Sequence, residues 1–375
     1  MLYQIALTQI SHLSPETIQK MMEDGIVPRM LIEHPEEALS QQAESVRVPL
    51  VKQIREQRDE ALAKAQRELE FAKQKSVRIL TPADADYPMR LSACVDAPSV
   101  LYYRGNADLN APCVLAVVGT RRATDYGMLT CRRIVAELSQ RIPHLLIVSG
   151  LAYGIDVTAH RASLANGLPT VGVVAHGIDT IYPAAHRNDA AAMTRNGGVI
   201  TEYVSGTRAH AMNFLRRNRI IAGMADATLI VESAARGGAL ATARLADSYG
   251  RAVMAVPGRT TDKMSEGCNH LIFRRLASCV TSADDIINIM EWQRFTTDST
   301  KTTEPDLFAQ TDRRECLPRE QRCILEVLEQ SDGMNLFDLQ KATALLAKDL
   351  TAALITLEIG GMVQKLPSGA YHLLP

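Results

Sequence analysis

The stretch from Arg208 to Ile221 holds the residues of this sequence that are best suited to binding chemistry. It reads RAHAMNFLRRNRII, with an aromatic ring and four arginines ahead of an apolar helical pattern. On a helix, Phe214 and Arg217 share one face, and Arg216 and Arg219 lie on a neighbouring face. Unpaired bases stack on aromatic rings, at about 1–3 kcal/mol each, while guanidinium groups bind phosphates. This stretch is therefore a candidate site for single-stranded nucleic acid.

A structural role for the same residues is the open alternative. Phe214 would then fill the core, and the arginines would form a solvated face or pair with acids such as Glu202 and Asp226. The glycine turns elsewhere in the sequence favour the binding interpretation.

Glycine turns between strands and helices predict an anion-binding cradle. Gly119 precedes Arg121, Gly150 and Gly154 follow a second strand, and Gly238 follows a third. Glycine permits a tight turn, and backbone N–H groups at a helix start bind anions. Ligands of open parallel sheets bind beyond the carboxyl ends of the strands, where these turns would meet. Each turn alone is equally explained by ordinary strand–helix geometry.

Signals for catalysis, metals and cofactors are weak. No G-x-G-x-x-G motif follows the apolar run at 114–118, and the sequence has no P-loop motif. Dinucleotide redox chemistry and P-loop NTP hydrolysis therefore lose support. Asp156 and His160 are four residues apart and could bind a metal or act as base and orienter, but helix capping is the favoured interpretation. Seven scattered cysteines without a C-x-x-C pair indicate neither a zinc site nor a disulfide framework. We expect no catalytic residue, no metal and no cofactor.

The elements that must position these loops form a regular alternation between residues 113 and 291. The expected strands are 114–118, 145–148, 170–174, 199–201, 227–231 and 252–256. The expected helices between them are 126–140, 155–166, 185–196, 213–223 and 239–249. Such alternation implies right-handed crossovers and a sheet covered on both faces. The sequence predicts an α/β fold with a doubly wound parallel sheet.

Three further regions flank this core. Residues 1–76 read as a small N-terminal helical region with a charged helix over 51–75, and residues 292–316 read as a polar, Thr-rich linker. Residues 317–375 show three helical patterns and two short strands, which is the layout of a winged helix. This last region carries five basic and seven acidic residues, so we expect protein contact or a structural role rather than groove binding.

Charge and composition narrow the function classes. The net charge is −1, yet residues 113–291 carry 18 Arg and one Lys against 14 acidic residues. Arginine suits bidentate phosphate contacts, and a compositional bias of the genome is the less favoured explanation of the excess. Apolar runs fall short of a membrane helix, and the N-terminus lacks the features of a secretory signal. Unpaired, scattered cysteines suit a reducing compartment, so we expect a cytoplasmic protein without membrane contact.

Many short motifs resemble those of one family, the DNA-processing protein A family (DprA, also called Smf). The resemblance covers roughly residues 77–291 with the motifs in the family's order. The motifs are DADYPMRL, DAPSVLYYRG, GTRRATDYG, SGLAYGIDVTAHRASLANG, GIDTIYP, NFLRRNRIIAG, ESAARGGALATA, AVPGR and SEGCNHLI.

The resemblance implies an extended Rossmann-like domain over 77–291 that binds single-stranded DNA and forms homodimers. It also implies loading of the RecA recombinase during natural transformation and recombination, with single-strand-binding protein as a further partner and without enzymatic activity. The family's Gly-Ser-Arg turn corresponds to Gly119, Thr120 and Arg121. Its Phe-x-x-Arg-Asn-Arg motif corresponds to Phe214, Arg217, Asn218 and Arg219.

Two other function classes stay open at this stage. A Rossmann-like enzyme acting on a nucleoside phosphate would use Asp156, Glu232 and Arg121. A pure interaction scaffold would show neither DNA binding nor turnover.

Overall fold

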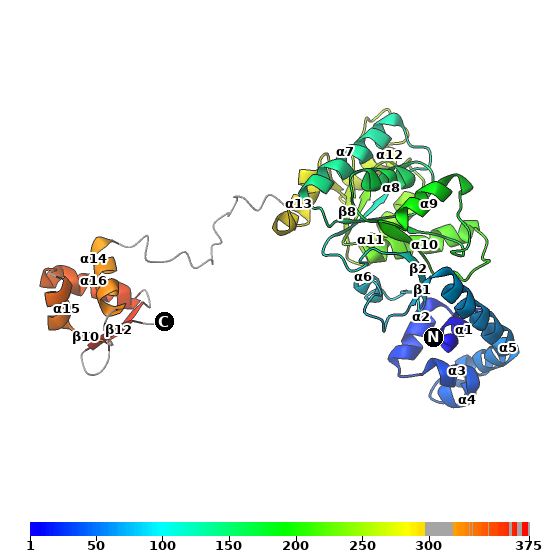
Figure 1. The fold of residues 1–375 in the computed structure, drawn as a ribbon, viewed down its shortest axis with the longest axis horizontal. Coiled ribbons are helices and arrows are strands. Elements are labelled where there is room, and N and C mark those ends of the chain that lie inside the picture. Colours follow the sequence, from blue (N-terminus) through cyan, green and yellow to red (C-terminus); the bar gives the residue numbers. More distant parts are fainter. Residues whose placement is uncertain are drawn as a thin grey trace. The chain divides into compact units, whose positions relative to one another are not determined.

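The computed structural model describes residues 1–296, 318–329, 331, 333–343, 345–359, 362–365 and 370–373 (Figure 1). The chain divides into two compact units, Met1–Thr300 and Lys301–Pro375. Most of the expected linker, residues 297–316, lies outside the described residues. The finer division of the first unit at residue 76 stays a prediction.

A nine-stranded sheet forms the centre of the first unit, in the order β1-β2-β6-β5-β4-β3-β7-β8-β9. The seven strands that follow one another in this order from β6 to β9 are all parallel. The two remaining strands are antiparallel, since β2 pairs antiparallel with β6 and β1 pairs antiparallel with β2. The predicted doubly wound parallel sheet is confirmed, with an antiparallel edge added by the segment before residue 106. The strands are β1 (Arg78–Leu80), β2 (Leu101–Gly105), β3 (Val114–Val118), β4 (Leu146–Ser149), β5 (Thr170–Val173), β6 (Gly197–Thr201), β7 (Ala227–Ile230), β8 (Ala252–Ala255) and β9 (Ser278–Cys279).

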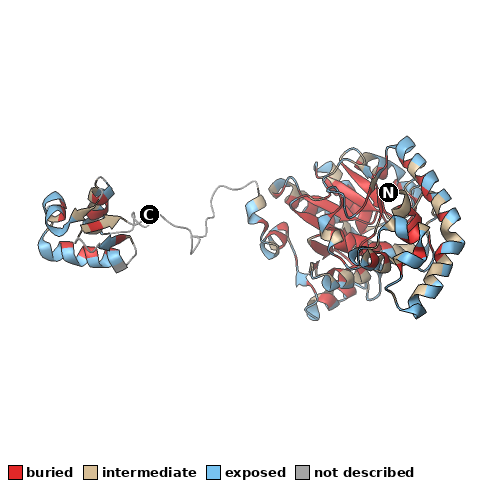
Figure 2. Ribbon diagram, turned by 90° about the horizontal axis from the view of Figure 1, so that it is seen from below, coloured by how far each residue is buried: buried red, intermediate tan, exposed pale blue. Residues whose placement is uncertain are grey.

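Helices cover both faces of this sheet. Alternate residues of a strand point to opposite faces, and in β3 both sets of residues are apolar and buried. Val114 and Ala116 belong to the apolar cluster under α10, α11 and α12, whereas Leu115 and Val117 belong to the cluster under α7, α8 and α13. In Figure 2 the central strands of this sheet are buried and the outer helix faces are exposed. The helices are α6 (Met89–Ser92), α7 (Asp125–Arg141), α8 (Ile155–Ala165), α9 (Arg187–Met193), α10 (Ala211–Met224), α11 (Gly238–Ser248), α12 (Glu266–Phe273) and α13 (Ala283–Ile289), with 3-10 turns η1 (Ala184–His186) and η2 (Trp292–Phe295).

The N-terminal region is helical, as expected. Proline occupies the first position of three helices, where its missing N–H costs nothing. The long helix begins at Glu44, earlier than predicted, and includes Pro49. The helices are α1 (Leu2–Thr8), α2 (Pro15–Glu23), α3 (Pro28–Glu33), α4 (Pro35–Ala38) and α5 (Glu44–Lys75).

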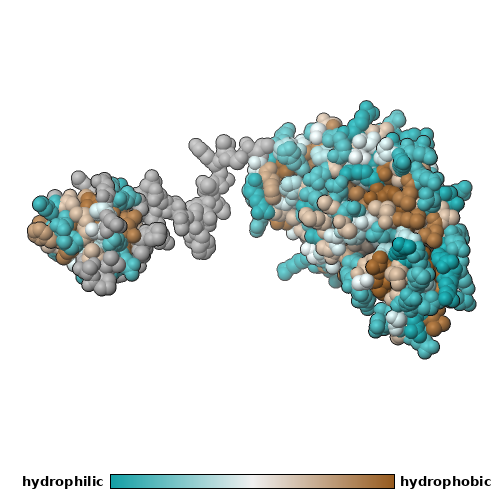
Figure 3. All heavy atoms as spheres, turned by 60° about the horizontal axis from the view of Figure 1, so that its bottom comes forward, coloured by the Kyte–Doolittle hydropathy of each residue, from teal (hydrophilic) through white to brown (hydrophobic). Residues whose placement is uncertain are grey.

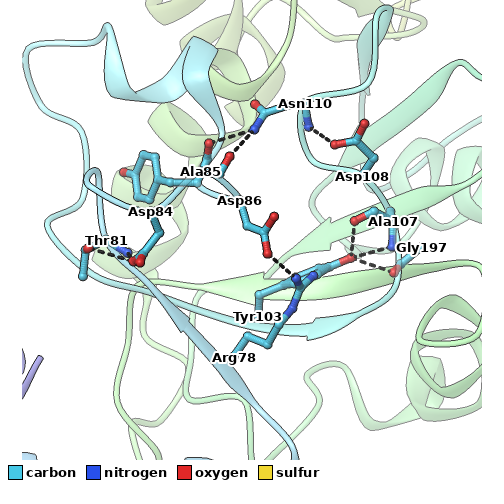
Figure 4. A network of polar contacts seen from close by, with 11 residues as sticks. Arg78, Thr81, Asp84, Ala85, Asp86, Tyr103, Ala107, Asp108, Asn110 and Gly197 are labelled. Carbon is cyan, nitrogen blue, oxygen red and sulfur yellow. Dashed lines mark hydrogen bonds and ion pairs between the residues drawn. The ribbon is translucent and has the colours of Figure 1, made fainter.

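A polar network connects the segment between residues 78 and 110 to the antiparallel edge of the sheet (Figure 4). The Tyr103 hydroxyl donates to the Gly197 carbonyl at 2.8 Å and accepts from the Ala107 N–H at 2.9 Å. Arg78 donates to Asp86 at 2.7 Å, and its Cζ lies 4.8 Å from the centroid of the Tyr103 ring. This network joins β1, β2 and β6 into one edge.

The described part of the second unit contains three helices and a small antiparallel sheet in the order β10-β12-β11. Its apolar cluster includes Ile324, Leu339, Leu354 and Tyr371. The three predicted helices and two predicted strands are present, while the assignment as a winged helix stays a prediction. The elements are α14 (Arg319–Glu329), β10 (Met334–Asn335), α15 (Leu336–Thr343), α16 (Ala347–Ile359), β11 (Val363–Lys365) and β12 (Ala370–Leu373).

The surface mixes hydrophobic patches with hydrophilic side chains, as one face shows in Figure 3. Phe273 at the end of α12 is 81% exposed. Among the described residues, no helix combines the length and apolar character that spanning a bilayer requires.

Candidate nucleic-acid interface

A cleft of about 540 Å³ opens beyond the carboxyl ends of β3 and β7. The turn after β3, the start of α8, the first turns of α10 and the start of α11 line it. Seven of the eleven predicted site residues lie there: Gly119, Thr120, Arg121, Phe214, Arg217, Asn218 and Gly238. The structure therefore brings together residues from three separate sequence motifs at the edge where the sheet topology predicted a ligand site.

The turn after β3 is fixed from two sides. Thr120 donates its backbone N–H to the Glu232 carbonyl at 2.7 Å, and its carbonyl accepts from the Ile155 N–H at 3.3 Å. A Cβ on Gly119 would lie 2.4 Å from Cγ1 of Ile155, so only glycine lets the turn approach α8 this closely. The turn thus holds the exposed Arg121 at the rim of the cleft.

Arg121 and Phe214 are in direct contact. The Arg121 Cζ lies 4.9 Å from the centroid of the Phe214 ring, which is the geometry of a cation–π contact. Phe214 is half-buried in the first turn of α10, so part of its ring faces the cleft. A ring and an exposed cation at one rim can receive a base and its phosphate together.

Arg217 lies beneath this pair rather than at the surface. It is only 3% exposed, and its Nη1 donates to the Val173 carbonyl at 2.8 Å. Burial lowers the pKa of Arg217 to about 10, against the opposing charge of nearby Asp156, so the side chain remains cationic at neutral pH. The geometry gives Arg217 a positioning role below the Phe214 ring, whose centroid is 5.8 Å from its Cζ.

Gly150 and Gly154 support the cleft without lining it. A Cβ on Gly150 would lie 1.9 Å from Nη1 of Arg217 and 2.6 Å from Oδ2 of Asp156. Gly154 has φ of +77°, and a Cβ there would lie 2.2 Å from the Thr120 carbonyl oxygen. These two glycines therefore permit the close packing of Arg217 and of the Arg121 turn.

Asn218 and Gly238 meet at the opposite wall. The Asn218 side-chain amide donates to the Gly238 carbonyl at 3.4 Å, and Gly238 begins α11. The space around the Gly238 Cα is open, so the start of this eleven-residue helix faces the cleft. Its first N–H groups and dipole favour an anion there.

Arg216 and Arg219 lie elsewhere. Both line a second cavity of about 580 Å³, bounded by α2 and by the segment after β6. Arg219 donates to Glu202 at 2.6 Å and lies 3.9 Å from Asp96, so it is paired as the structural alternative expected. The structure does not bring these two arginines to Phe214, and their direct contact with DNA stays a prediction.

The groups considered for catalysis have structural partners. Both oxygens of the Glu232 carboxylate accept from Thr124, at 2.9 Å from its N–H and 2.6 Å from its hydroxyl. Asp156 accepts from the Ala152 N–H at 3.4 Å, and burial raises its pKa. Nδ1 of His160 forms a hydrogen bond with the hydroxyl of Thr170, 2.7 Å away, rather than with Asp156. Among the described residues, no cluster of three potential metal ligands occurs.

Three residues near the cleft were not singled out from the sequence. Arg122 and Arg236 are exposed and line the cleft, and the Tyr182 ring lies 5.7 Å from that of Phe214. Arg236 directly precedes the glycine pair of the loop after β7, so the sequence could have indicated that it lies near the cleft. Tyr182 belongs to the GIDTIYP motif, but its approach to Phe214 depends on how the loop after β5 and the first turn of α10 come together in the fold.

The model of the family described as DNA recombination-mediator protein A matches residues 78–291. The chain belongs to this family. A DNA processing protein DprA of Mycobacterium tuberculosis is 40% identical over 236 residues, which is 60% of each chain. DprA of Streptococcus pneumoniae is 39% identical over 223 residues, covering 60% of this chain and 77% of its own. Protein Smf of Synechocystis is 31% identical over 332 residues, covering 81% of this chain and 82% of its own.

Two solved structures agree with this membership. The X-ray structure of S. pneumoniae DprA has a TM-score of 0.66 at 33% identity, over 77% of this chain and 97% of that chain. A structure of Helicobacter pylori DprA, described for its single-stranded DNA binding mode, has a TM-score of 0.52 at 27% identity, over 58% and 96% of the two chains. The fold of the first unit is thus that of DprA proteins.

Proposed function

We propose that this chain binds single-stranded DNA in the cleft, with a base on the Phe214 ring and a phosphate at Arg121. The contact between these two side chains at 4.9 Å is the observation that supports this most directly. Exposed Arg122 and Arg236 add cations to the rim, and the start of α11 adds backbone N–H groups. The binding mode described for the H. pylori relative supports the same ligand.

The mechanism is capture by charge followed by stacking. Phosphates displace counterions at the cationic rim, and an unpaired base can then reach the ring, whereas a paired base in a duplex cannot. Arg217 contributes from below by fixing the Phe214 turn of α10 against β5.

A salt titration tests this proposal. Fluorescence anisotropy with oligo(dT) and with a duplex of equal length is expected to show preference for the single strand and steep salt dependence. R121A lowers the affinity and reduces the slope of log K against log salt by about 0.7, the share of one phosphate contact. R133A is the matched control, because Arg133 on α7 is half-exposed and paired with Glu137. Equal affinity and slope for R121A and R133A would contradict the proposal.

Loading of RecA onto strands covered by single-strand-binding protein is the finer function we propose, in DNA uptake and recombination. The family's description as a recombination mediator supports it. The expected result is that the full chain shortens the lag before RecA hydrolyses ATP on DNA precoated with single-strand-binding protein, and that R121A does not. An unchanged lag with the wild-type chain would exclude this role.

We further propose that the chain acts as a homodimer. Phe273 at the end of α12 is 81% exposed and Leu276, three residues later, is 47% exposed, and we propose that a second copy covers these two side chains. Sedimentation of the wild-type chain is expected to show a dimer and of F273D a monomer. A wild-type monomer at micromolar concentration would contradict this.

We propose no chemical turnover for this site. Incubation of the chain with nucleoside monophosphates, followed by chromatography, is expected to return the substrates unchanged. Product formation that D156N abolishes would instead establish the enzymatic alternative.

A further inference from the structure

Tyr182 lies beside the cleft and has no role in the site described above. Its ring centroid is 5.7 Å from that of Phe214, with the two planes at 55°, and the residue is 52% exposed. Tyr182 comes from the loop between β5 and η1, whereas Phe214 comes from the first turn of α10. Two aromatic rings from separate elements therefore meet at the carboxyl-end edge of the sheet.

A buried histidine holds the backbone of Tyr182. The Tyr182 N–H donates to Nε2 of His176 at 3.1 Å, and Nδ1 of His176 lies 2.9 Å from the Gly177 carbonyl oxygen. One tautomer satisfies both contacts, with the proton on Nδ1 and a free lone pair on Nε2. His176 is 1% exposed, and burial lowers its pKa, which favours this neutral form. Tyr182 is thus presented from a fixed loop.

The surroundings of the two rings combine apolar side chains with cations. Met212 and Leu215, in the same turns of α10 as Phe214, are 52% and 53% exposed. Clustered exposed apolar residues mark a binding surface. Because Arg121 lies over the Phe214 ring, a ligand at this surface must bind both aromatic rings and guanidinium groups. A polynucleotide does so, since its bases stack on the rings and its phosphates bind the guanidinium groups.

We propose that Tyr182 is a second stacking surface, which receives an unpaired base next to the one on Phe214. The inference rests on the proposed function, since it needs a strand in the cleft. The 5.7 Å between ring centroids exceeds the spacing of about 3.4 Å between stacked nucleotides of a duplex strand, so adjacent bases must separate to occupy both rings. Tyr182 would in this way add to the preference for single strands.

Tryptophan emission can report this contact directly. Trp292 is the single tryptophan of the sequence and is 4% exposed, so it gives a constant background. We expect oligo(dT) to quench the emission of a Y182W variant of the full chain. A V27W variant, which changes an exposed residue of the N-terminal region, is the control and stays unquenched.

Affinity measurements complete the test. Y182A is expected to lower the affinity for oligo(dT) about fivefold or more, while Y182F, which keeps the ring, stays within about twofold of wild type. If wild type binds oligo(dT) but Y182A binds equally and Y182W is not quenched, this inference is wrong and the proposed function stands. If wild type does not bind oligo(dT), both fail. If Y182W emission responds to RecA and not to oligo(dT), the surface docks protein and the inference is again wrong.

Discussion

Arg217 donates a hydrogen bond from Nη1 to the carbonyl oxygen of Val173, 2.8 Å away, and so joins α10 to the end of β5. This contact lies directly below the ring that we propose to stack a base. Arg217 thus supports the ring from below and also lines the cleft, and its own contact with DNA stays a prediction. Removing it should affect both the fold and the binding of DNA.

We expect R217A to lower the free energy of unfolding by roughly 3 kcal/mol, because it removes the buried cation beside Asp156, breaks the hydrogen bond to Val173 and opens a cavity. Its affinity for oligo(dT) should fall as well, since the Phe214 turn loses its anchor. Urea unfolding followed by Trp292 emission checks the first effect in the unit that contains the cleft. R216A removes an exposed arginine one residue earlier and should change stability by less than about 0.5 kcal/mol. Equal stability of R217A and R216A would refute the assigned role.

Gly150 provides an independent test of the same support. G150A places a Cβ 1.9 Å from Nη1 of Arg217, and the hydrogen bond to Val173 keeps that side chain from moving aside cheaply. We expect G150A to destabilise the unit and to weaken oligo(dT) binding. In an R217A background the same substitution should cost clearly less, because the clashing group is gone. Strict additivity of the two substitutions in urea unfolding would show that the clash is not the cause.

The sequence predicted the layout of the sheet and the convergence of the loops for a physical reason. Strand and helix periodicity is local, so α7, α8, α10 and α11 lie within one or two residues of their expected bounds. Once the strands are parallel, their carboxyl ends meet at one edge, and the Arg121 turn and Phe214 must approach each other.

The burial of individual side chains could not be predicted in this way. Helical spacing placed Phe214 with Arg217 and Arg216 with Arg219, which is correct. Which face meets β5 depends on residues far away in the sequence, such as Gly150, which leaves room for the Arg217 guanidinium. The pairing of Arg219 with Glu202 likewise depends on where β6 ends.

A buried histidine predicts how stability depends on pH. The Thr170 hydroxyl donates to the Ile147 carbonyl at 3.0 Å, so it must accept from Nδ1–H of His160, and Nε2 of His160 has no partner among the described residues. Burial lowers the pKa of His160 to about 3, from an ordinary value of 6.5. The unfolded chain therefore binds this proton at a higher pH than the folded chain does.

Stability should accordingly fall as the pH drops from about 6.5 towards 3, with a contribution from His160 near 2 kcal/mol at pH 5. H160N keeps a donor near Thr170 but cannot be protonated, so its stability should fall less over the same range. Urea unfolding at several pH values, followed by Trp292 emission, measures the difference between the two chains. Parallel pH profiles for wild type and H160N would show that His160 is not the proton-linked group.

Gly154 and Gly167 form a matched pair that isolates the role of the Arg121 turn. Both have positive φ, +77° and +76°, so alanine is strained at either position. A Cβ at Gly154 would also lie 2.2 Å from the Thr120 carbonyl oxygen, whereas a Cβ at Gly167 meets nothing within 4 Å. G154A must therefore push the turn away from α8 and carry Arg121 with it, while G167A leaves the turn in place.

We expect both alanine variants to lose stability, by about 1 kcal/mol for G167A and by more for G154A. Anisotropy with oligo(dT) should separate them further, because only G154A moves the cation that binds phosphate, and its affinity should approach that of R121A. Combining G154A with R121A should then add little to the loss in affinity. Binding by G154A at the wild-type level, despite its lower stability, would mean that the position of this turn does not control capture of the strand.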